Sequence, residues 1–202
     1  MIKSDEWIYD LVDLAAAQAA RDSEGMHGAF ARLHAGGRDA EVEEAILQSY
    51  LFLGFPSAIE TFRRWRAHGV DAPEAAAEEF EAWIERGEQT CATVYGDHYE
   101  RLRENIARFH PDLDRWMVLE GYGKVLSRAA LSLGVREMLI IAMLVVQGAS
   151  GRRQLRSHLQ GALNAGVAPG DIETTIRRAA AFGPPQNLEL ALELWAAVRR
   201  SE

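Results

Sequence analysis

The sequence predicts an all-α fold built from about eight helices in a single domain. Apolar residues recur at intervals of three and four along almost every segment, and no stretch shows the alternation of a half-buried strand. Glycine and proline divide the chain into segments of helical length. With 202 residues the chain is long enough to bury one core, so we expect residues 1–202 to form one domain.

Four helices are expected in the N-terminal part of the chain. The first carries an apolar stripe over 7–15, and the second, at about 28–35, is followed by two glycines of the kind that end helices. A third helix over 40–53 has one apolar side, and the Gly-Phe-Pro sequence at 54–56 separates it from a fourth over 57–68.

The central part is expected to form three or four helices. Proline and acidic residues favour a helix start at Pro73, and the helix continues towards Gly87. A second helix over 89–109 ends before Pro111, because the residue preceding a proline is driven out of the α region. Residues 112–128 follow as one helix, or as two helices interrupted by glycines.

Two helices in the C-terminal part attract most attention. The stretch REMLIIAMLVV (136–146) is apolar on all sides, which is typical of a helix buried against several neighbours, and we expect it at the centre of the core. The next helix begins at about Arg153, has Leu155 and Leu159 in its apolar stripe, and ends at Gly166.

A weak internal repeat relates the two ends of the chain. Residues 34–62 align with residues 164–192 when one single-residue gap is allowed, and both contain a glycine stop, a helix, a glycine-proline break and a second helix. Alternatively, any two helical hairpins rich in alanine and glutamate would look alike. The position that matches His158 is Gly28, with His27 one place away, and we expect this N-terminal position to be structural.

The composition argues against several classes of partner. A formal net charge of −8 gives no overall footprint for nucleic acid or an acidic membrane surface, so an anionic ligand would need a local basic cluster. Cys91 is the single cysteine and cannot form an intrachain disulfide, which favours a reducing compartment. The N-terminus lacks the apolar run of a signal peptide, and the longest apolar run is too short to span a bilayer. We therefore expect a cytoplasmic protein with no membrane partner.

A polar constellation surrounds the histidine of the helix near residue 158. Gln154, His158, Gly161 and Ala165 lie together beside the apolar stripe at helical spacing. The small residues leave room beside the imidazole for a ligand, or they allow another helix to pack closely. The sequence alone leaves both possibilities open.

Glu137 is the second candidate in this region. We expect it in the first turn of the all-apolar helix, where the helix N-terminus favours a carboxylate, with its side chain directed to the interior. A carboxylate and an imidazole that meet in a partly apolar hollow can move a proton at neutral pH. The alternatives are structural: His158 as an ordinary buried histidine, and Glu137 as a helix-terminus or ion-pair residue.

Arg152, Arg153 and Arg156 form the local basic cluster that the acidic total otherwise lacks. The planar guanidinium matches a carboxylate, so a small carboxylated molecule is the expected guest, although these arginines could equally be solvated or paired with acidic residues. The other histidines stand apart in the sequence without ligand spacing, so no metal is expected. Nucleotide-binding glycine motifs and a nucleophilic-serine motif are also missing from the sequence, and we expect no cofactor.

Several segments resemble one known family. LSLGVREMLIIAMLVVQG (131–148) and QLRSHLQGALNAGVAPGDIETTI (154–176) resemble the core of the carboxymuconolactone decarboxylase family, which is related to the alkylhydroperoxidase-D-like proteins. TVYGDHYERL (93–102) and DLDRWMVLEGYGKVLSR (112–128) resemble the segments that precede this core. GFPSAIETF (54–62) resembles the closing Gly-Phe-Pro motif of the family, displaced into the N-terminal copy.

The resemblance implies an all-helical fold that assembles into homo-oligomers, often trimers or hexamers. It assigns residues 90–202 to the family core and residues 1–70 to the N-terminal repeat copy. Glu137 and His158 match the positions of the proton-relaying glutamate and histidine in the peroxidase branch. The Cys-x-x-Cys pair of that branch is replaced here by GRRQLRS (151–157), so a dithiol peroxidase does not carry over.

The resemblance implies instead a lyase activity, the cofactor-free decarboxylation of a carboxylated lactone or related acid–base chemistry. In this hypothesis His158 is the general acid and Glu137 orients or recharges it. Arg152 or Arg156 holds a substrate carboxylate, and Gln154 donates to the developing oxyanion. Two alternatives remain: a peroxidase that works through Cys91 without the dithiol, and a non-catalytic oligomeric helical protein with a ligand pocket.

Overall fold

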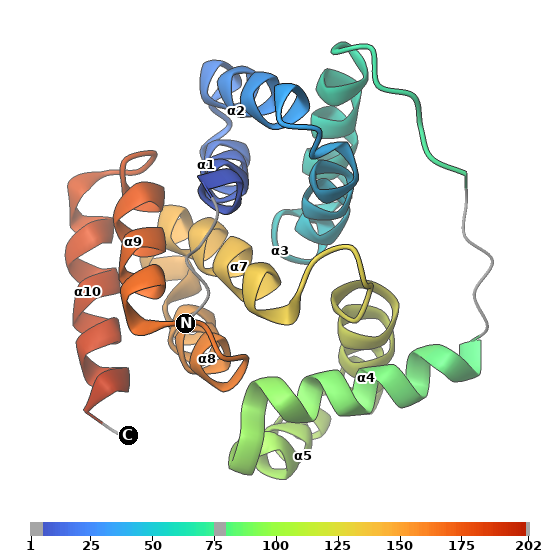
Figure 1. Cartoon of the computed structure of the whole chain (residues 1–202). Coiled ribbons are helices and arrows are strands. Elements are labelled where there is room, and N and C mark those ends of the chain that lie inside the picture. Colours follow the sequence, from blue (N-terminus) through green and yellow to red (C-terminus); the bar gives the residue numbers. More distant parts are fainter. Residues whose placement is uncertain (1–5, 75–79, 201–202) are drawn as a thin grey trace. The chain divides into compact units, whose positions relative to one another are not determined.

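The computed structural model describes residues 6–74 and 80–200, and these residues form helices, turns and irregular segments without a strand (Figure 1). The all-α prediction is therefore confirmed for this part of the chain. Two compact units are present. Unit 1 combines residues 1–72 and 130–202, unit 2 spans 73–129, and each is described by itself below. The organisation of the chain as a single domain stays a prediction.

The N-terminal part of unit 1 contains α1 (Glu6–Ala20), α2 (Ser23–Ala35) and α3 (Asp39–Arg66). Asp22 caps α2, because its side chain accepts hydrogen bonds from two backbone N–H groups of the first turn. This cap starts α2 five residues before the predicted start near Gly28. The acidic N-cap was the signal that the sequence analysis overlooked.

The helices predicted on either side of the Gly-Phe-Pro sequence form the continuous run α3 with a kink. Gly54 has a φ of 80° and a ψ of 160°, a backbone conformation that a residue with a side chain rarely adopts. The break was therefore predicted at the right place. This one non-helical residue separates the two helices that α3 joins.

The C-terminal part of unit 1 contains α7 (Leu133–Gln147), η3 (Gly148–Gly151), α8 (Arg152–Asn164), α9 (Pro169–Ala180) and α10 (Pro185–Arg199). Every residue of α7 from the third to the thirteenth is buried. This helix packs against α1, α3, α8, α9 and α10 (Figure 1). The predicted central helix of the core is confirmed.

The helix order of unit 1 is repeated. Helices α1 and α7 both have 15 residues, and α2 and α8 both have 13. In the third helix of each set the aligned residues Ile46 and Ile176 are both fully buried. The junctions to the fourth helix lie at Gly54 and at Gly183, which the alignment also pairs. The repeat seen in the sequence thus corresponds to two similar successions of helices.

One segment of the described residues, Leu133–Asn164, has the length and apolarity of a membrane-spanning helix. Of its most apolar window, 67% is buried inside the fold. The segment comprises α7, the short 3₁₀ turn η3 and α8. Its apolarity follows from its place in the core of unit 1.

Unit 2 contains α4 (Phe80–Tyr95), η1 (Gly96–His98), α5 (Tyr99–Phe109), α6 (Pro111–Trp116) and the π-helix η2 (Met117–Leu126). The predicted helix end before Pro111 is confirmed, since α5 stops at Phe109 and the next residue is extended. The helix predicted over 89–109 is divided by η1. Its first part is the second half of α4.

Glycines of unit 2 serve packing where the sequence predicted helix ends. Gly87 lies inside α4, and a Cβ there would overlap the backbone carbonyl oxygen of Val118. Gly123 lies inside η2, and a Cβ there would overlap the backbone of Trp83. The predicted helix end at Gly87 and the interruption at Gly123 are therefore wrong, because both glycines allow α4 and η2 to approach closely.

The start predicted at Pro73 is also wrong as far as the structure describes it. Pro73 and Glu74 are irregular, and residues 75–79 of that predicted helix lie outside the described residues.

Candidate functional site

Glu137 and His158 meet in the core of unit 1. Glu137 projects from α7 and His158 from α8, and the distance between His158 Nδ1 and Glu137 Oε2 is 2.8 Å. The Glu137 side chain is fully buried, and the His158 side chain is 7% exposed. The prediction that these two groups meet across adjoining helices is confirmed. The hollow expected between them stays a prediction.

The local sequence explains why the two side chains face each other. Only the four residues of η3 separate α7 from α8, so the two helices pack against each other. On α8, His158 shares the buried face with Leu155, Leu159, Gly161 and Ala162. Of the two small residues predicted beside the imidazole, Gly161 is buried on this face and Ala165 is half-buried just after the helix. Gly166 follows with a φ of 82°.

Glu137 lies deeper in its helix than the sequence suggested. The helix α7 begins at Leu133 and is capped by Ser132, whose hydroxyl oxygen accepts a hydrogen bond from Val135 N at 3.3 Å. Glu137 is therefore the fifth residue of the helix, beyond the first turn in which the helix dipole acts on a side chain. The expected helix-terminus stabilisation is wrong, whereas the expected inward direction of the carboxylate is confirmed.

One oxygen of this carboxylate lacks a partner. Glu137 Oε1 is buried and has no hydrogen bond within the part of the chain that the structure describes. A buried acceptor without a hydrogen bond costs folding free energy, about 1–3 kcal/mol and more if charged. Such a cost is tolerated most readily where a substrate or water supplies the missing donor.

The contact with Glu137 sets the roles of the two imidazole nitrogens when the carboxylate is ionised. An ionised carboxylate can only accept, so Nδ1–H is then the donor and Nε2 is the nitrogen left to exchange a proton with a bound molecule. The edge-to-face ring of Phe52 lies 5.6 Å from the imidazole, measured between centroids. The backbone oxygen of Phe52 accepts a hydrogen bond from Gln147 Nε2 at 3.1 Å, which links this part of α3 to the end of α7.

The three predicted substrate-binding residues lie on the exposed side of α8. Arg152, Gln154 and Arg156 are all exposed. A terminal nitrogen of Arg152 lies 3.5 Å from Glu193 Oε1 on α10. Among the described residues, the hydrogen bonds and ion pairs of Glu137 and His158 include none of the three. Their role in binding a substrate stays a prediction.

The sequence analysis missed a buried polar cluster beside Glu137. Arg136 is fully buried, and its guanidinium donates to Glu44 Oε2 at 2.8 Å and to Gln48 Oε1 at 3.1 Å. Gln48 Nε2 donates in return to the backbone oxygen of Arg136 at 3.3 Å. These bonds tie α3 to α7 one residue before Glu137. The signal was the spacing of four between Glu44 and Gln48 on a helix with an apolar face.

The described residues contain no group of three or more histidine, cysteine, aspartate or glutamate side chains placed to share a metal ion. Cys91 is buried on α4 of unit 2. The histidines that stand apart in the sequence do not all stand apart in space. The rings of His27 and His68 lie 4.9 Å apart, between α2 and the turn after α3.

Comparisons with known proteins find one matching family and two related proteins for this chain. Residues 111–197 match the model of the carboxymuconolactone decarboxylase family. "Peroxisomal protein 2" of Schizosaccharomyces pombe is 32% identical over 132 residues, which cover 63% of this chain and 61% of that protein. The chain therefore spans less than two thirds of the length of this relative. An uncharacterized 15.0 kDa protein from the nqo9-nqo10 intergenic region of Paracoccus denitrificans is 33% identical over 107 residues, or 52% of this chain and 78% of that protein.

Proposed function

The chain belongs to the carboxymuconolactone decarboxylase family, and from this we propose that the Glu137–His158 pair performs acid–base chemistry on a small carboxylated substrate. The reaction that fits best is a decarboxylation that needs no cofactor. The observation that carries the proposal is the buried contact of 2.8 Å between Nδ1 and Oε2, because it leaves Nε2 as the proton-exchanging atom.

The chemistry has three steps in this proposal. The carbon–carbon bond to the carboxylate breaks, CO₂ departs, and the electron pair remains on a carbon conjugated to the lactone carbonyl as an enolate. Nε2–H of protonated His158 then delivers its proton to that carbon. The neutral ring regains a proton from water before the next turnover.

Glu137 acts as a positioning residue in this scheme. Its Oε2 holds the ring through Nδ1 and stabilises the imidazolium by charge, as a carboxylate does for a histidine in many acid–base sites. Its unpartnered Oε1 supports the proposal, since it can accept a hydrogen bond from a substrate hydroxyl or from the water that recharges the ring.

Arg152 and Arg156 are the candidates for holding the substrate carboxylate, and Gln154 is the candidate donor to the oxyanion. All three side chains lie at exposed positions on α8. They would therefore contact the substrate from the solvent side of this helix. We further propose that the protein works in the cytoplasm as a homo-oligomer. Analytical ultracentrifugation of the full chain tests the oligomer part directly.

The test is CO₂ release from a panel of carboxylated lactones by the full-length protein. We expect His158→Gln to lower kcat by about 100-fold or more, the usual contribution of a general acid. Gln160→Ala, on the same helix and bonded to Asn164 rather than to the pair, serves as the matched control and should keep its rate. Equal rates in the wild type and in His158→Gln would remove His158 from the mechanism.

Two other outcomes would contradict the proposal. Saturable ligand binding without turnover of any member of the panel would support the non-catalytic alternative. Hydroperoxide consumption that disappears in Cys91→Ser would support a peroxidase instead.

A further inference from the structure

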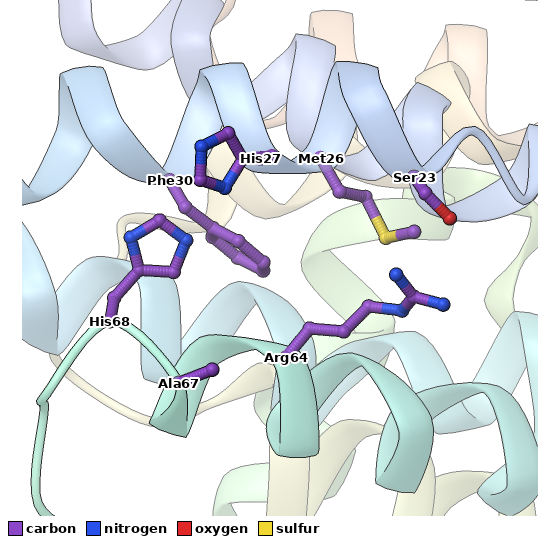
Figure 2. A pocket seen from close by; sticks show the side chains of 7 residues that line it. All are labelled: Ser23, Met26, His27, Phe30, Arg64, Ala67 and His68. Carbon is purple, nitrogen blue, oxygen red and sulfur yellow. The ribbon is translucent and has the colours of Figure 1, made fainter.

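A cavity of about 290 Å³ lies between α2 and the C-terminal end of α3, on the N-terminal copy of the repeat (Figure 2). Its floor is apolar: Met26 and Phe30 line it and are 5% and 1% exposed. Ser23, His27, Arg64 and His68 supply the polar part of the lining. Among the described residues, no carboxylate lines this cavity, although acidic residues outnumber basic ones in the whole chain.

The cavity is distinct from the Glu137–His158 site. His158 aligns with Gly28 in the internal repeat, and the cavity is lined by the neighbouring His27. It is therefore not a second version of the same pair. We predicted this N-terminal position to be structural, whereas its surroundings have the chemistry of a binding site.

Arg64 has hydrogen-bonding capacity left over. Its Nε is buried and makes no hydrogen bond within the described residues, although Glu60 Oε1 lies 3.1 Å away in a poorly directed ion pair. Glu60 is also bound by the neighbouring Arg63, which donates to both carboxylate oxygens at 2.9 and 2.8 Å. One carboxylate thus serves two guanidinium groups, so an additional anion would complete the pairing of Arg64.

Two histidines add imidazole hydrogen-bonding groups to the lining of the cavity. The rings of His27 and His68 lie 4.9 Å apart, and His34 also lies on α2 near this end of α3. Burial lowers the pKa of His68, and positive charge on His27 and His34 lowers it further. The nearby carboxylate on α3, Glu43, is already engaged by Arg66 and by Trp65 Nε1. His34 is paired with Asp39 at the start of α3, with Nδ1 2.9 Å from Oδ1, and it does not line the cavity.

We propose that this cavity binds a small organic anion, a carboxylate carried on an apolar ring. The carboxylate pairs with Arg64 and accepts a hydrogen bond from Ser23, and the ring lies on Phe30 and Met26. Figure 2 shows the guanidinium of Arg64 beside Met26 and Ser23, and His27 and His68 together at the other end of the cavity. A polar substituent on the far side of the ring would reach the two imidazoles.

The test is isothermal titration of the full-length protein with benzoate, with benzyl alcohol as the neutral analogue and inorganic phosphate as the anion without a ring. We expect saturable binding of benzoate, and weaker binding of both analogues. Arg64→Gln should weaken benzoate binding at least about tenfold, because it removes a charged donor. Arg177→Gln removes an exposed arginine that pairs with Glu173 on α9 and does not line the cavity, so it should bind as the wild type does.

A second variant tests the location without removing charge. Ala67 is exposed, lines the cavity and lies just after the end of α3. Ala67→Leu should fill the cavity and reduce benzoate binding while the thermal unfolding temperature stays close to that of the wild type. The proposal is overturned if benzoate fails to saturate, if benzyl alcohol or phosphate binds as tightly as benzoate, or if neither Arg64→Gln nor Ala67→Leu weakens benzoate binding.

Discussion

The buried cluster of Arg136, Glu44 and Gln48 yields the sharpest stability prediction. In Glu44→Gln the guanidinium of Arg136 keeps its bond to Gln48 but loses the carboxylate at 2.8 Å, while Arg136 itself stays fully buried. Removing the carboxylate partner of a buried charge typically costs about 3–5 kcal/mol. We expect a loss of that size in the free energy of unfolding.

Urea unfolding followed by circular dichroism measures this loss. The matched control is Glu41→Gln at the start of α3, whose partner Arg38 lies 3.0 Å away with a side chain that is 37% exposed. A surface pair of this kind contributes about 0–1 kcal/mol. The double variant Glu44→Gln/Arg136→Met should recover part of the loss, because it also removes the buried charge that the carboxylate stabilised. Equal losses in Glu44→Gln and Glu41→Gln would refute the reasoning.

Two further predictions concern unit 2 and the histidine cluster. Gly123→Ala should lower the unfolding temperature of unit 2 in calorimetry, because the added Cβ overlaps the backbone of Trp83. Gly121→Ala is the control and should have little effect, because its Cβ would enter open space. Similar unfolding temperatures for both variants would contradict this packing. The pKa of His68 should be below its ordinary value of 6.5 in an NMR titration, and should move back towards that value in His27→Gln. Below pH 6.5 the unfolded chain then binds more protons at His68 than the folded chain does. The contribution of His68 to the free energy of unfolding is therefore complete above pH 6.5 and is lost as the pH falls. A pKa for His68 at or above 6.5 would contradict this.

Local patterns predicted those parts of the fold that local physics determines. The all-apolar stretch 136–146 became the buried helix α7, and the helix ends at Pro111 and Gly166 follow from backbone sterics near proline and glycine. The start of α2 was missed although its signal is local. Asp22 caps that helix, and the sequence analysis started it from the apolar spacing alone.

The errors arose where a residue serves tertiary packing. Gly87 looks like a helix end in the sequence, but it lies inside α4. A glycine is needed there because a neighbouring helix passes too close for a Cβ. Periodicity gives the side of a helix on which a residue lies, but it does not give the partner that occupies that side.

The candidate site also has a part that the sequence predicted and a part that it did not. The pairing of Glu137 and His158 was predicted from the resemblance and from helical spacing, and the contact confirms it. Phe52 and the partners of Arg136, Glu44 and Gln48, were missed because they come from α3, far away in the sequence. Likewise, nothing local brings His27 near His68. Their proximity depends on the packing of α2 against α3.

The proposed mechanism depends most on which nitrogen of His158 donates the hydrogen bond to Glu137. Long-range ¹H–¹⁵N NMR of the imidazole, recorded on the wild type and on Glu137→Gln across the neutral pH range, measures this without a substrate. We predict that Nδ1 stays protonated throughout in the wild type and that the neutral ring has a free Nε2. A neutral His158 ring protonated at Nε2 in the wild type, or one whose nitrogen shifts do not change in Glu137→Gln, would contradict the account.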